Sequence, residues 1–486
     1  MNMLGKCSDK TNRKVEYKNL FMKKLIIVLL YFVAITAKAD YPIFWQRYTA
    51  DPWCIEHDGR LYMFCSHDVY DPQQGYKYIM KDITCISTDD LKNWTDHGEV
   101  FSIADAAWKP QLTWAPCVVE RDHRFYLYYG NGDKGIGVAI SDSPTGPYKD
   151  ISTKPMVDSN TPGVLSGRKT ANGVRGALKG SENWGFWCFD PAVFVDDDGQ
   201  AYMYFGGANP ANSRIIRLKR NMVEVEGKAM HPDTPGFFEA SAMHKYKGKY
   251  YYSYSGHWFN NPSNIDYVMS DSPMRGFGEV HTAMVNPPVN EHNNHHHCIF
   301  EYQGQWYMAY HNRQVAYENG ISDPNARIYQ RSVALDRLYY NADGTIQPVE
   351  ATRDGLPQIR WVNPYQRNEA ETMAKGWGIS TEQIDGKNRA AVFSHDDNYI
   401  RIRGVDLSQG INMFKAVAKG CGKIDVRLEG QNGVLLCTLP VNVTNWKEIS
   451  MPAISANGIF DIFLVFHGAA DEEVKLDYWT FQSKQS

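Results

Sequence analysis

The sequence has little of what marks several common protein classes. Only 22% of its 486 residues are charged, and 51 lysines and arginines nearly balance 55 aspartates and glutamates, giving a net charge of −4. That balance leaves no basic excess to attract nucleic acid. No apolar run reaches the roughly 20 residues of a membrane-spanning helix, and no Cys-x-x-Cys pair indicates zinc. The chain is therefore globular, and its length predicts two domains.

The N-terminus has the pattern of an export signal. Two lysines precede an unbroken apolar run, Leu25 to Ile35, which is followed by Ala37-Lys38-Ala39, a small-x-small cleavage site. We interpret residues 1–39 as a signal peptide that is removed before Asp40, which predicts a secreted or periplasmic protein. No cysteine follows the apolar run, so we expect no lipid anchor.

Eight cysteines remain after the predicted leader. An even number in an exported chain permits disulfides. Several of them lie within apolar, strand-like runs, where a free cysteine packs as a small hydrophobic residue. We expect mostly free, buried thiols and keep disulfides as the alternative. The eight are Cys54, Cys65, Cys85, Cys117, Cys188, Cys298, Cys421 and Cys437.

A five-fold repeat is the most informative pattern in the chain. Each copy is a turn residue, usually glycine, followed by a short strand with a central tyrosine, and His123 replaces the glycine in one copy. Hairpins repeated in this way predict an all-β fold, a five-bladed β-propeller built of four-stranded sheets. An irregular β-sandwich is the alternative. The central tyrosines are Tyr62, Tyr126, Tyr202, Tyr251 and Tyr307.

The repeat ends near residue 348, which predicts a domain boundary. We assign residues 40–350 to the propeller and residues 351–364 to a polar linker. Residues 365–486 contain alternating apolar and polar segments separated by turn residues, for example 399–403 and 423–428. About 120 residues of this kind predict a β-sandwich of the jelly-roll type.

Residues that precede each repeat tyrosine by 11 or 12 positions predict the functional site. The first strand of each blade starts near the propeller axis, so these residues should converge on one pocket. Three carboxylates there cannot all keep their ordinary pKa values. A protonated carboxylic acid beside an ionised carboxylate is the pair that glycosidic bond hydrolysis needs. The converging residues are Asp51, Trp114, Asp190, Glu239 and His296.

Each of these residues also has an ordinary structural interpretation. An Asp-Pro pair, as at Asp51 and Asp190, is often only a turn, and Trp114 is either core or a platform for a sugar ring. The histidine-rich run from Glu291 to His297 does not predict zinc, because adjacent histidines of a strand point to opposite faces. Only His296 is in the converging register, so we expect it to order the axis or to contact a central ion through water.

At these residues the sequence resembles glycoside hydrolase family 43, from about Asp40 to Glu350. The resemblance implies an inverting glycosidase in which Asp51 is the general base, Glu239 the general acid and Asp190 the residue that tunes the pKa of the acid. It also implies a structural calcium near His296. The motifs that carry it include Ala50-Asp51-Pro52-Trp53, Thr113-Trp114-Ala115-Pro116, Phe189-Asp190-Pro191, Phe238-Glu239-Ala240 and His296-His297-Cys298.

Within this resemblance, Trp53, Trp114 and Arg331 are the candidate substrate-binding residues. The related family 32 is disfavoured, because its Asn-Asp-Pro-Asn motif is replaced by Ala50-Asp51-Pro52-Trp53.

The C-terminal segment contains Asn368-Glu369-Ala370-Glu371, Asp397-Asn398-Tyr399-Ile400 and Leu476-Asp477-Tyr478-Trp479. At these residues it resembles a carbohydrate-binding module of family 6. The resemblance implies calcium at Glu369, Glu371 and Asp477, an all-oxygen set, and a sugar held between Phe393 and Trp446. Lys475 stands where an asparagine usually binds the ligand. A purely structural sandwich is the alternative.

Together these patterns predict an exo-acting glycosidase that releases L-arabinofuranose from arabinoxylan-type hemicellulose and needs no organic cofactor. A β-xylosidase and an endo-arabinanase are the alternative enzymes, and a carbohydrate-binding propeller without activity is the alternative outside catalysis. The expected partner is a plant cell-wall polysaccharide or oligosaccharide.

Overall fold

The structure is a computed structural model of the 486-residue chain. It describes residues 42–75, 77–165, 186–208, 210–256, 263–287, 289–290, 294–353 and 355–484. The predicted signal peptide, residues 1–39, lies outside this part of the chain. Within it, no helix is long and apolar enough to cross a membrane.

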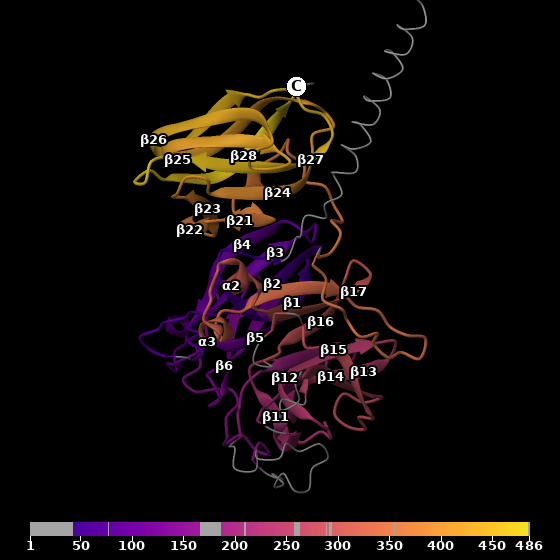
Figure 1. The fold of residues 1–486 in the computed structure, drawn as a ribbon. Helices are drawn as coiled ribbons and strands as arrows, with labels where there is room; N and C mark the ends of the chain where they lie inside the picture. Colours follow the sequence, from indigo (N-terminus) through magenta and orange to yellow (C-terminus); the bar gives the residue numbers. More distant parts are fainter. Residues whose placement is uncertain are drawn as a thin grey trace, which may run out of the picture. The chain divides into compact units, whose positions relative to one another are not determined.

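Residues 49–337 form five small antiparallel sheets, which confirms the predicted five-bladed propeller (Figure 1). Blade 1 contains β1 (Thr49–His57), β2 (Arg60–His67), β3 (Asp82–Thr88) and β4 (Trp94–Ser102). Blade 2 contains β5 (Trp114–Arg121), β6 (Arg124–Gly130) and β7 (Ile136–Ser141). Blade 3 contains β8 (Ala192–Val195), β9 (Ala201–Phe205), β10 (Arg214–Leu218) and β11 (Val225–Met230).

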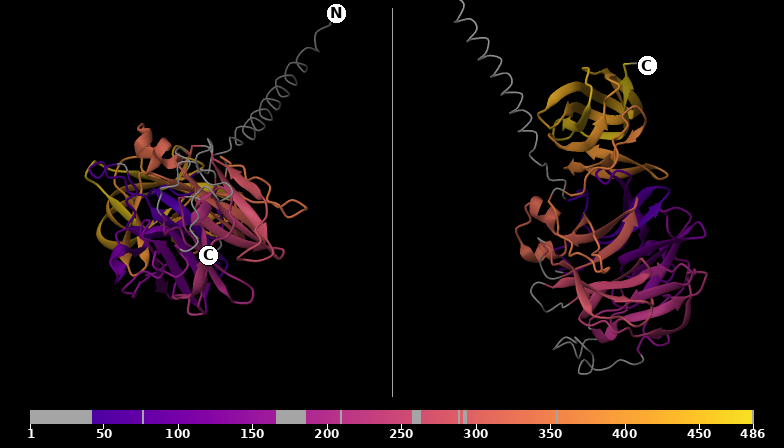
Figure 2. Two further views of the ribbon diagram at one scale, coloured as in Figure 1. Left: turned by 90° about the horizontal axis from the view of Figure 1, so that it is seen from below. Right: turned by 90° about the vertical axis from the view of Figure 1, so that its right-hand side faces the viewer.

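Blades 4 and 5 complete the ring. Blade 4 contains β12 (Phe237–Tyr246), β13 (Lys249–Gly256), β14 (Asn264–Ser270) and β15 (Val280–Val285). Blade 5 contains β16 (His297–Tyr302), β17 (Gln305–Asn312) and β18 (Ser332–Arg337), with helices α2 (Gln314–Glu318) and α3 (Pro324–Ile328) between the last two strands. Two short 3-10 turns are η1 (Ile103–Asp105) and η3 (Pro210–Asn212). The colours follow one another round the ring when it is seen from below (Figure 2).

Blades 2 and 5 have three strands each, where the sequence analysis expected four. In blade 2 the segment after β7 makes only isolated bridges, Ile140 to Lys149 and Ile136 to Val157. That segment contains Pro147 and Pro155, which have no N–H group to donate to a continuous ladder.

The repeated glycines lie in the hairpins that join the first and second strands of the blades. Gly59, Gly199, Gly248 and Gly304 have φ between 74° and 81°. His123 occupies the equivalent turn between β5 and β6 with a φ of 60°. Such left-handed turns match the twist of the two strands they connect, which explains why the repeat selects glycine.

The C-terminal domain is one nine-stranded sheet that curls back on itself. Its long strands β25 and β26 pair with each other, and β25 also pairs first with β28 and then with β27. The change of partner occurs at Gly420, where a Cβ would lie 2.0 Å from the carbonyl oxygen of Glu473. The strands are β19 (Asn368–Glu369), β21 (Lys375–Trp377), β22 (Ser380–Asp385), β23 (Asn388–Phe393), β24 (Tyr399–Asp406), β25 (Ile411–Leu428), β26 (Val434–Pro452), β27 (Ile459–His467) and β28 (Val474–Ser483).

Blade 1 and the C-terminal domain are joined by backbone and side-chain contacts. The short strand β20 (Thr372–Met373) pairs with β4 and so becomes a fifth strand of blade 1. Arg47 donates to both carboxylate oxygens of Asp96, at 2.6 and 2.7 Å, and the Thr381 hydroxyl donates to the same carboxylate at 2.5 Å. Because Asp96 is buried, it needs these partners.

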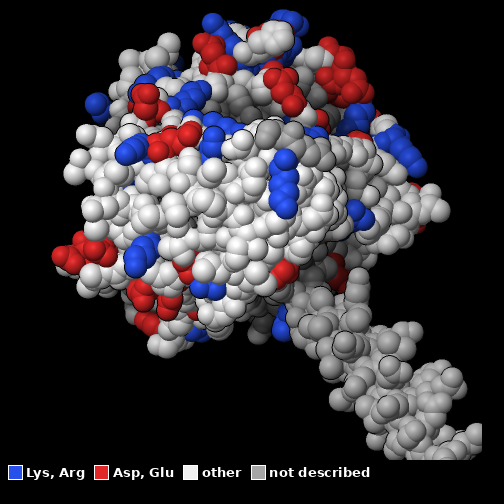
Figure 3. All heavy atoms as spheres, turned by 90° about the horizontal axis from the view of Figure 1, so that it is seen from above, with Lys and Arg blue, Asp and Glu red and all other residues white. Residues whose placement is uncertain are grey.

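Each domain has its own apolar core, and basic and acidic side chains are mixed on the outside. The propeller core contains Cys54, Cys65, Cys85, Cys117, Cys188 and Cys298. All eight described cysteines are free thiols, and among them Cys421 is exposed. Figure 3 shows blue and red side chains interspersed on the face drawn, in line with the small net charge.

Candidate active site

The first strands of blades 1, 2 and 4 each carry a β-bulge at the axis. Ala50, Trp114 and Glu239 are the last paired residues before the register shifts. The residue after each of them has a positive φ, as does Asp190 in blade 3, with values between 47° and 59°. A bulge re-aims neighbouring side chains. In each blade, the repeat tyrosine pairs with a residue of the first strand, and the equivalent axis position lies four residues before that residue. These positions are Asp51, Ala115, Asp190, Ala240 and His296.

This register corrects one detail of the sequence analysis. Trp114 and Glu239 lie one residue before the positions equivalent to Asp51 and Asp190. A count of 11 or 12 residues back from each tyrosine could not detect this offset, because the position of a bulge cannot be read from the length of a hairpin. Both kinds of position nevertheless reach the same cavity.

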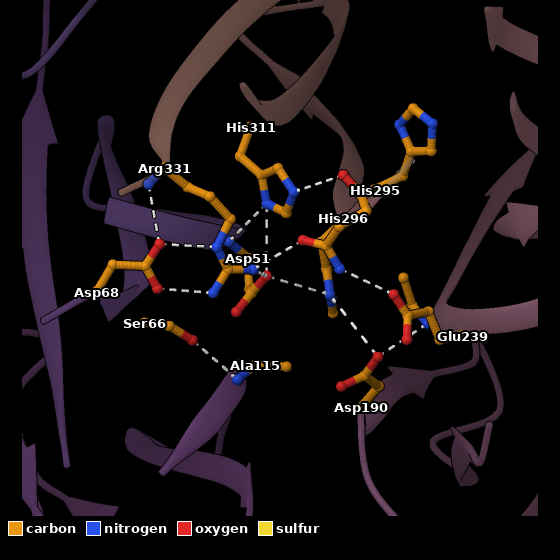
Figure 4. Close-up of polar contacts among 12 residues, drawn as sticks. Asp51, Ser66, Asp68, Ala115, Asp190, Glu239, His295, His296, His311 and Arg331 are labelled. Carbon is orange, nitrogen blue, oxygen red and sulfur yellow. Dashed lines mark hydrogen bonds and ion pairs between the residues drawn. The ribbon is translucent and has the colours of Figure 1, made fainter. Parts of the chain in front are cut away.

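The backbone N–H of each bulged residue is bound by a side chain from the preceding blade in the ring. Asp51 donates to His311 Nδ1 at 3.2 Å, Ala115 to the Ser66 hydroxyl at 2.9 Å, and Ala240 to Asp190 Oδ2 at 2.9 Å (Figure 4). Since buried N–H groups need partners, these contacts hold the backbone that carries the acidic residues.

The converging side chains line a cavity of about 460 Å3. Asp51, Asp190 and Glu239 are 4%, 5% and 7% exposed, so all three carboxyl groups are nearly buried. Aromatic side chains supply much of the remaining wall, a combination that is typical of a small-molecule site. The lining residues are Asp51, Tyr78, Met80, Trp114, Asp133, Trp187, Phe189, Asp190, Phe238, Glu239, Asn294, His296 and Arg331.

Asp51 is held in its ionised form. Burial alone would raise the pKa of its carboxyl group, but the positive charge of Arg331 is the largest of the contacts that place the pKa well below its ordinary value. Arg331 Nη1 lies 2.6 Å from Asp51 Oδ1. His311 Nδ1 accepts the Asp51 N–H, so its Nε2 carries the proton and donates to the Asn294 carbonyl at 3.0 Å.

The pKa values of Asp190 and Glu239 are both raised, which favours their protonated forms. Burial raises the pKa of Glu239 to about 8, and the negative charge of Asp51 adds to this shift. Burial, Glu239 and Asp51 likewise raise the pKa of Asp190 well above its ordinary value. Asn294 Nδ2 donates to Glu239 Oε1 at 2.9 Å. The cavity therefore combines an ionised carboxylate with a protonated acid pair.

Arg331 lines the cavity, but its guanidinium group is fixed by protein carboxylates. It donates from Nε and Nη2 to Asp68 at 2.8 and 2.7 Å and from Nη1 to Asp51. Its guanidinium carbon lies 4.6 Å from the Tyr78 ring centroid. Its contacts thus place it as the residue that orients and ionises Asp51.

The sequence analysis missed several residues of this site, among them Asp68, Tyr78, Asn294 and His311. Asn294 lies in the histidine-rich run, which was noticed only for its histidines. Asp68 follows the end of β2 and His311 is near the end of β17, so both reach the axis from second strands, where no repeat motif draws attention to them.

Trp53 does not line the cavity, which corrects its prediction as a substrate-binding residue. Its indole N–H donates to the Val118 carbonyl at 2.9 Å, and the side chain is 7% exposed between blades 1 and 2. Trp114, in contrast, lines the cavity as expected.

The aromatic pair expected in the C-terminal domain is not formed. Phe393 is fully buried in the domain core beside Phe466, so it offers no face to a sugar. Trp446 is half-buried and has the Lys419 ammonium 4.8 Å from its ring centroid.

The expected calcium ligands of this domain do not fit a cation as they lie. Arg367 binds Glu369 at 2.6 Å and Asp477 at 2.9 Å, so a guanidinium occupies the place between these two carboxylates. Glu371 is buried, and burial raises its pKa to about 8. In the described part of the chain, the possible ligand atoms of Asp396, Asp397 and His467 lie within 4.8 Å of one another.

His296 lies on the axis, 3.6 Å from Asp51 Oδ1 and 3.9 Å from Asp190 Oδ2. Burial lowers its pKa to about 4, so the imidazole is neutral. Since calcium takes mainly oxygen ligands, this geometry suits a contact through water.

Comparison with known proteins agrees with this site. Residues 40–346 match the family model for glycosyl hydrolases family 43, which covers both the acidic cluster and the five blades. The chain belongs to this family. It is therefore a glycoside hydrolase. Residues 369–483 match the model for a carbohydrate binding module of family 6.

Individual members of the family are similar over most of the chain. An arabinoxylan arabinofuranohydrolase of Bacillus subtilis (strain 168) is 34% identical, with 91% of this chain and 92% of that protein covered. A crystal structure of an arabinoxylan arabinofuranohydrolase from Bacillus subtilis superposes with a TM-score of 0.78 at 33% identity, covering 92% of this chain and 98% of that one. An α-L-arabinofuranosidase from Clostridium thermocellum is 52% identical, with a TM-score of 0.54, and covers 65% of this chain and 98% of its own.

Proposed function

We propose that this family 43 hydrolase is an inverting exo-α-L-arabinofuranosidase that removes arabinose from arabinoxylan-type hemicellulose. One observation carries the proposal: ionised Asp51 shares a buried cavity with the protonated pair of Asp190 and Glu239. The names of the Bacillus and Clostridium relatives support arabinofuranose as the sugar.

In the proposed reaction, Glu239 donates its proton to the glycosidic oxygen as the bond to the anomeric carbon breaks. Asp51 accepts a proton from the water that attacks that carbon from the other side. Asp190 accepts the backbone N–H of Ala240, next to Glu239, and so holds the acid in place, while burial and the charge of Asp51 keep the pKa of Glu239 raised. The polymer departs as an alcohol, and the products are one free arabinose and one polymer that has lost that side group.

The size and the lining of the cavity support release of single terminal sugars. It has acidic groups at the axis and aromatic walls from blades 2 to 4, including Trp114, Phe189 and Phe238. An endo-acting enzyme needs a groove that is open at both ends. A cavity of about 460 Å3 suits one terminal sugar ring and its linkage.

The test is to incubate the purified chain with wheat-type arabinoxylan and to identify the products by anion-exchange chromatography. We expect free arabinose. Xylose would instead establish a xylosidase, longer oligosaccharides an endo-acting enzyme, and no product from any pentose polymer a binding protein. Proton NMR of the first-formed sugar tests the stereochemistry, and a product that retains the anomeric configuration would contradict the inverting mechanism.

Three further assignments are part of the proposal. The first is export after cleavage before Asp40, which N-terminal sequencing of the mature protein tests.

The second is the division into residues 40–350, 351–364 and 365–486. It is supported by Val349, which belongs to a propeller core cluster, and by Tyr365, which packs against the C-terminal core. The third is a calcium ion that His296 contacts through water. A melting temperature unchanged by EDTA would count against this ion.

A further inference from the structure

A second cavity, of about 420 Å3, is lined by three segments of the chain. Blade 1 contributes side chains that include Arg60 and Asp89, residues 360–369 form one wall, and Ile402 and Trp479 belong to the C-terminal domain. The pairing of β20 with β4 joins the segments that form it. Neither matched family model includes residues 347–368. Trp361, which lines the cavity, therefore lies outside both models.

Trp361 is a half-exposed aromatic side chain in the wall of this cavity. It is 52% exposed, so about half of its surface is open to solvent. Its position is nevertheless fixed. Val362 donates its N–H to the Gly404 carbonyl at 2.9 Å, and a Cβ on Gly404 would lie 2.7 Å from Trp361 Cε3. The ring therefore packs against a residue that has no side chain, and its remaining surface borders the cavity.

Two accessible tryptophans of the C-terminal domain, in contrast, have cations near their rings. Lys375 Nζ lies 5.6 Å from the ring centroid of Trp377, and Lys419 Nζ lies 4.8 Å from that of Trp446. Among the described residues, no comparable cation or aromatic contact involves Trp361. Its ring is thus available to a ligand.

The charges around the cavity select a neutral ligand rich in hydroxyl groups. Three arginines face three carboxylates, and Arg360 Nη1 lies 3.4 Å from Asp89 while Arg367 binds Glu369. This wall has no net charge to attract an anion or a cation, but it offers hydrogen-bond donors and acceptors side by side. Sugar hydroxyls both donate and accept, and the C–H face of a sugar ring packs on an aromatic face. The charged residues are Arg60, Arg360, Arg367, Asp89, Asp90 and Glu369.

We propose that this cavity is a second carbohydrate site, in which Trp361 stacks against a sugar ring of the polysaccharide main chain. The identity of that polymer rests on the proposed function, but the site itself does not. It supplies an exposed aromatic platform that Phe393, buried in the core, does not provide.

The test uses the Glu239→Gln chain, so that the polymer is not cleaved, and compares Trp361→Ala with Trp377→Ala in that background. Mobility is measured by affinity electrophoresis in gels containing soluble arabinoxylan or unsubstituted β-1,4-xylan. We expect Trp361→Ala to weaken retention by roughly tenfold, since the apolar contact of one aromatic face is lost. We expect Trp377→Ala to leave retention unchanged, Trp361→Phe to restore part of it, and salt to have little effect.

Turnover of a small aryl arabinofuranoside by the otherwise unaltered chain separates this proposal from the proposed function. Trp361→Ala should keep the kcat/KM and the melting temperature of the parent. Unchanged retention of Trp361→Ala, or an equal loss with Trp377→Ala, would overturn the second site. Retention abolished by moderate salt would overturn the assignment of a neutral ligand. Failure to cleave any arabinoside would overturn the proposed function alone.

Discussion

Asp51 and Glu239 are both nearly buried carboxyl groups, yet their surroundings drive their pKa values in opposite directions. Arg331 lies 2.6 Å from Asp51, whereas Glu239 has the neutral amide of Asn294 as its hydrogen-bond partner and a negative charge nearby. A charge of opposite sign favours ionisation, while burial and a charge of like sign oppose it. Two similar groups thereby acquire the different roles that hydrolysis requires.

The first prediction concerns the pH dependence of activity. Glu239 must be protonated, and its pKa is raised to about 8, so kcat/KM should fall as pH rises through about 8. Asp51 must be ionised, and its lowered pKa keeps it so throughout the mildly acidic range. Initial rates on an aryl arabinofuranoside between pH 4 and 10 check this. A profile that falls below pH 6 while the protein remains folded would contradict it.

The second prediction is that Glu239→Gln removes the general acid without unfolding the chain. We expect kcat to fall by about 10²- to 10⁴-fold, as is usual when proton donation is lost. Activity assays with circular dichroism check the result. Glu301→Gln, an exposed residue of β16, is the matched control and should keep the parent rate. A Glu239→Gln chain with parental activity would remove Glu239 from this role.

The third prediction assigns Asp68 a positioning role. Asp68→Asn replaces the charged partner that holds Arg331 through two hydrogen bonds, so Arg331 should bind Asp51 less firmly. The pKa of Asp51 should then rise, and the pH profile should gain an acidic limb that the parent lacks. Rates measured from pH 4 to 7 detect this limb. A uniform loss of activity without a change in profile would indicate a merely structural role.

At the scale of single elements, the hairpins of the five blades repeat one left-handed backbone conformation, with glycine in four of them and His123 as the one exception in residue type. Gly248 has a φ of 81° in open space, whereas His123 adopts a φ of 60° in the equivalent turn of blade 2. A residue with a side chain is strained at a positive φ, which destabilises the folded state. The same side chain also restricts the conformations of the unfolded chain, which favours folding.

The fourth prediction follows from this exception. His123→Gly should stabilise the propeller by about 0.5–1 kcal/mol, because relief of the left-handed strain exceeds the entropy that glycine adds. Gly248→Ala is the reciprocal control and should destabilise, since no neighbouring atom crowds the new methyl group and only backbone strain acts. Chemical denaturation measures both. A destabilising His123→Gly would show that the histidine side chain makes a favourable contribution in the turn.

At the scale of the whole molecule, the C-terminal domain completes blade 1. β20 pairs with β4, and Trp94, which is 1% exposed, lies on that strand. Arg47 and Thr381, from opposite sides of the boundary, meet at the buried Asp96. The propeller is thus bound to its partner domain by a shared sheet edge, and not only by a linker.

The fifth prediction is that a chain ending at residue 364 is less stable than the full chain. Loss of β20 leaves β4 as an open sheet edge and removes the Thr381 partner of Asp96. We expect the melting temperature of the propeller to fall by roughly 5 °C or more. Differential scanning calorimetry measures it. Independent melting of the two domains at unchanged temperatures would contradict the shared edge.

The sequence by itself determined the repeat and the chemistry of the axis. Periodic tyrosines and turn glycines predicted five blades because hairpin geometry is local and restricts φ. Asp51, Asp190 and Glu239 could be identified because the repeat sets their register. Four strands were expected in every blade, and the absence of a fourth strand in blades 2 and 5 could not be predicted, because strand pairing depends on which segments meet in space.

Only the tertiary structure decided the partners that give each side chain its role. Asp68 and His311 approach the axis from strands without a motif, and Asn294 bridges Glu239 and Arg331 across blades. Phe393 was expected to contact sugar, but it is buried, while Trp361, in a segment interpreted as a linker, is exposed in a cavity. Burial and long-range charge depend on which segments meet in space. Local patterns fix a residue's position in its strand, whereas the fold fixes its dielectric surroundings and its neighbours.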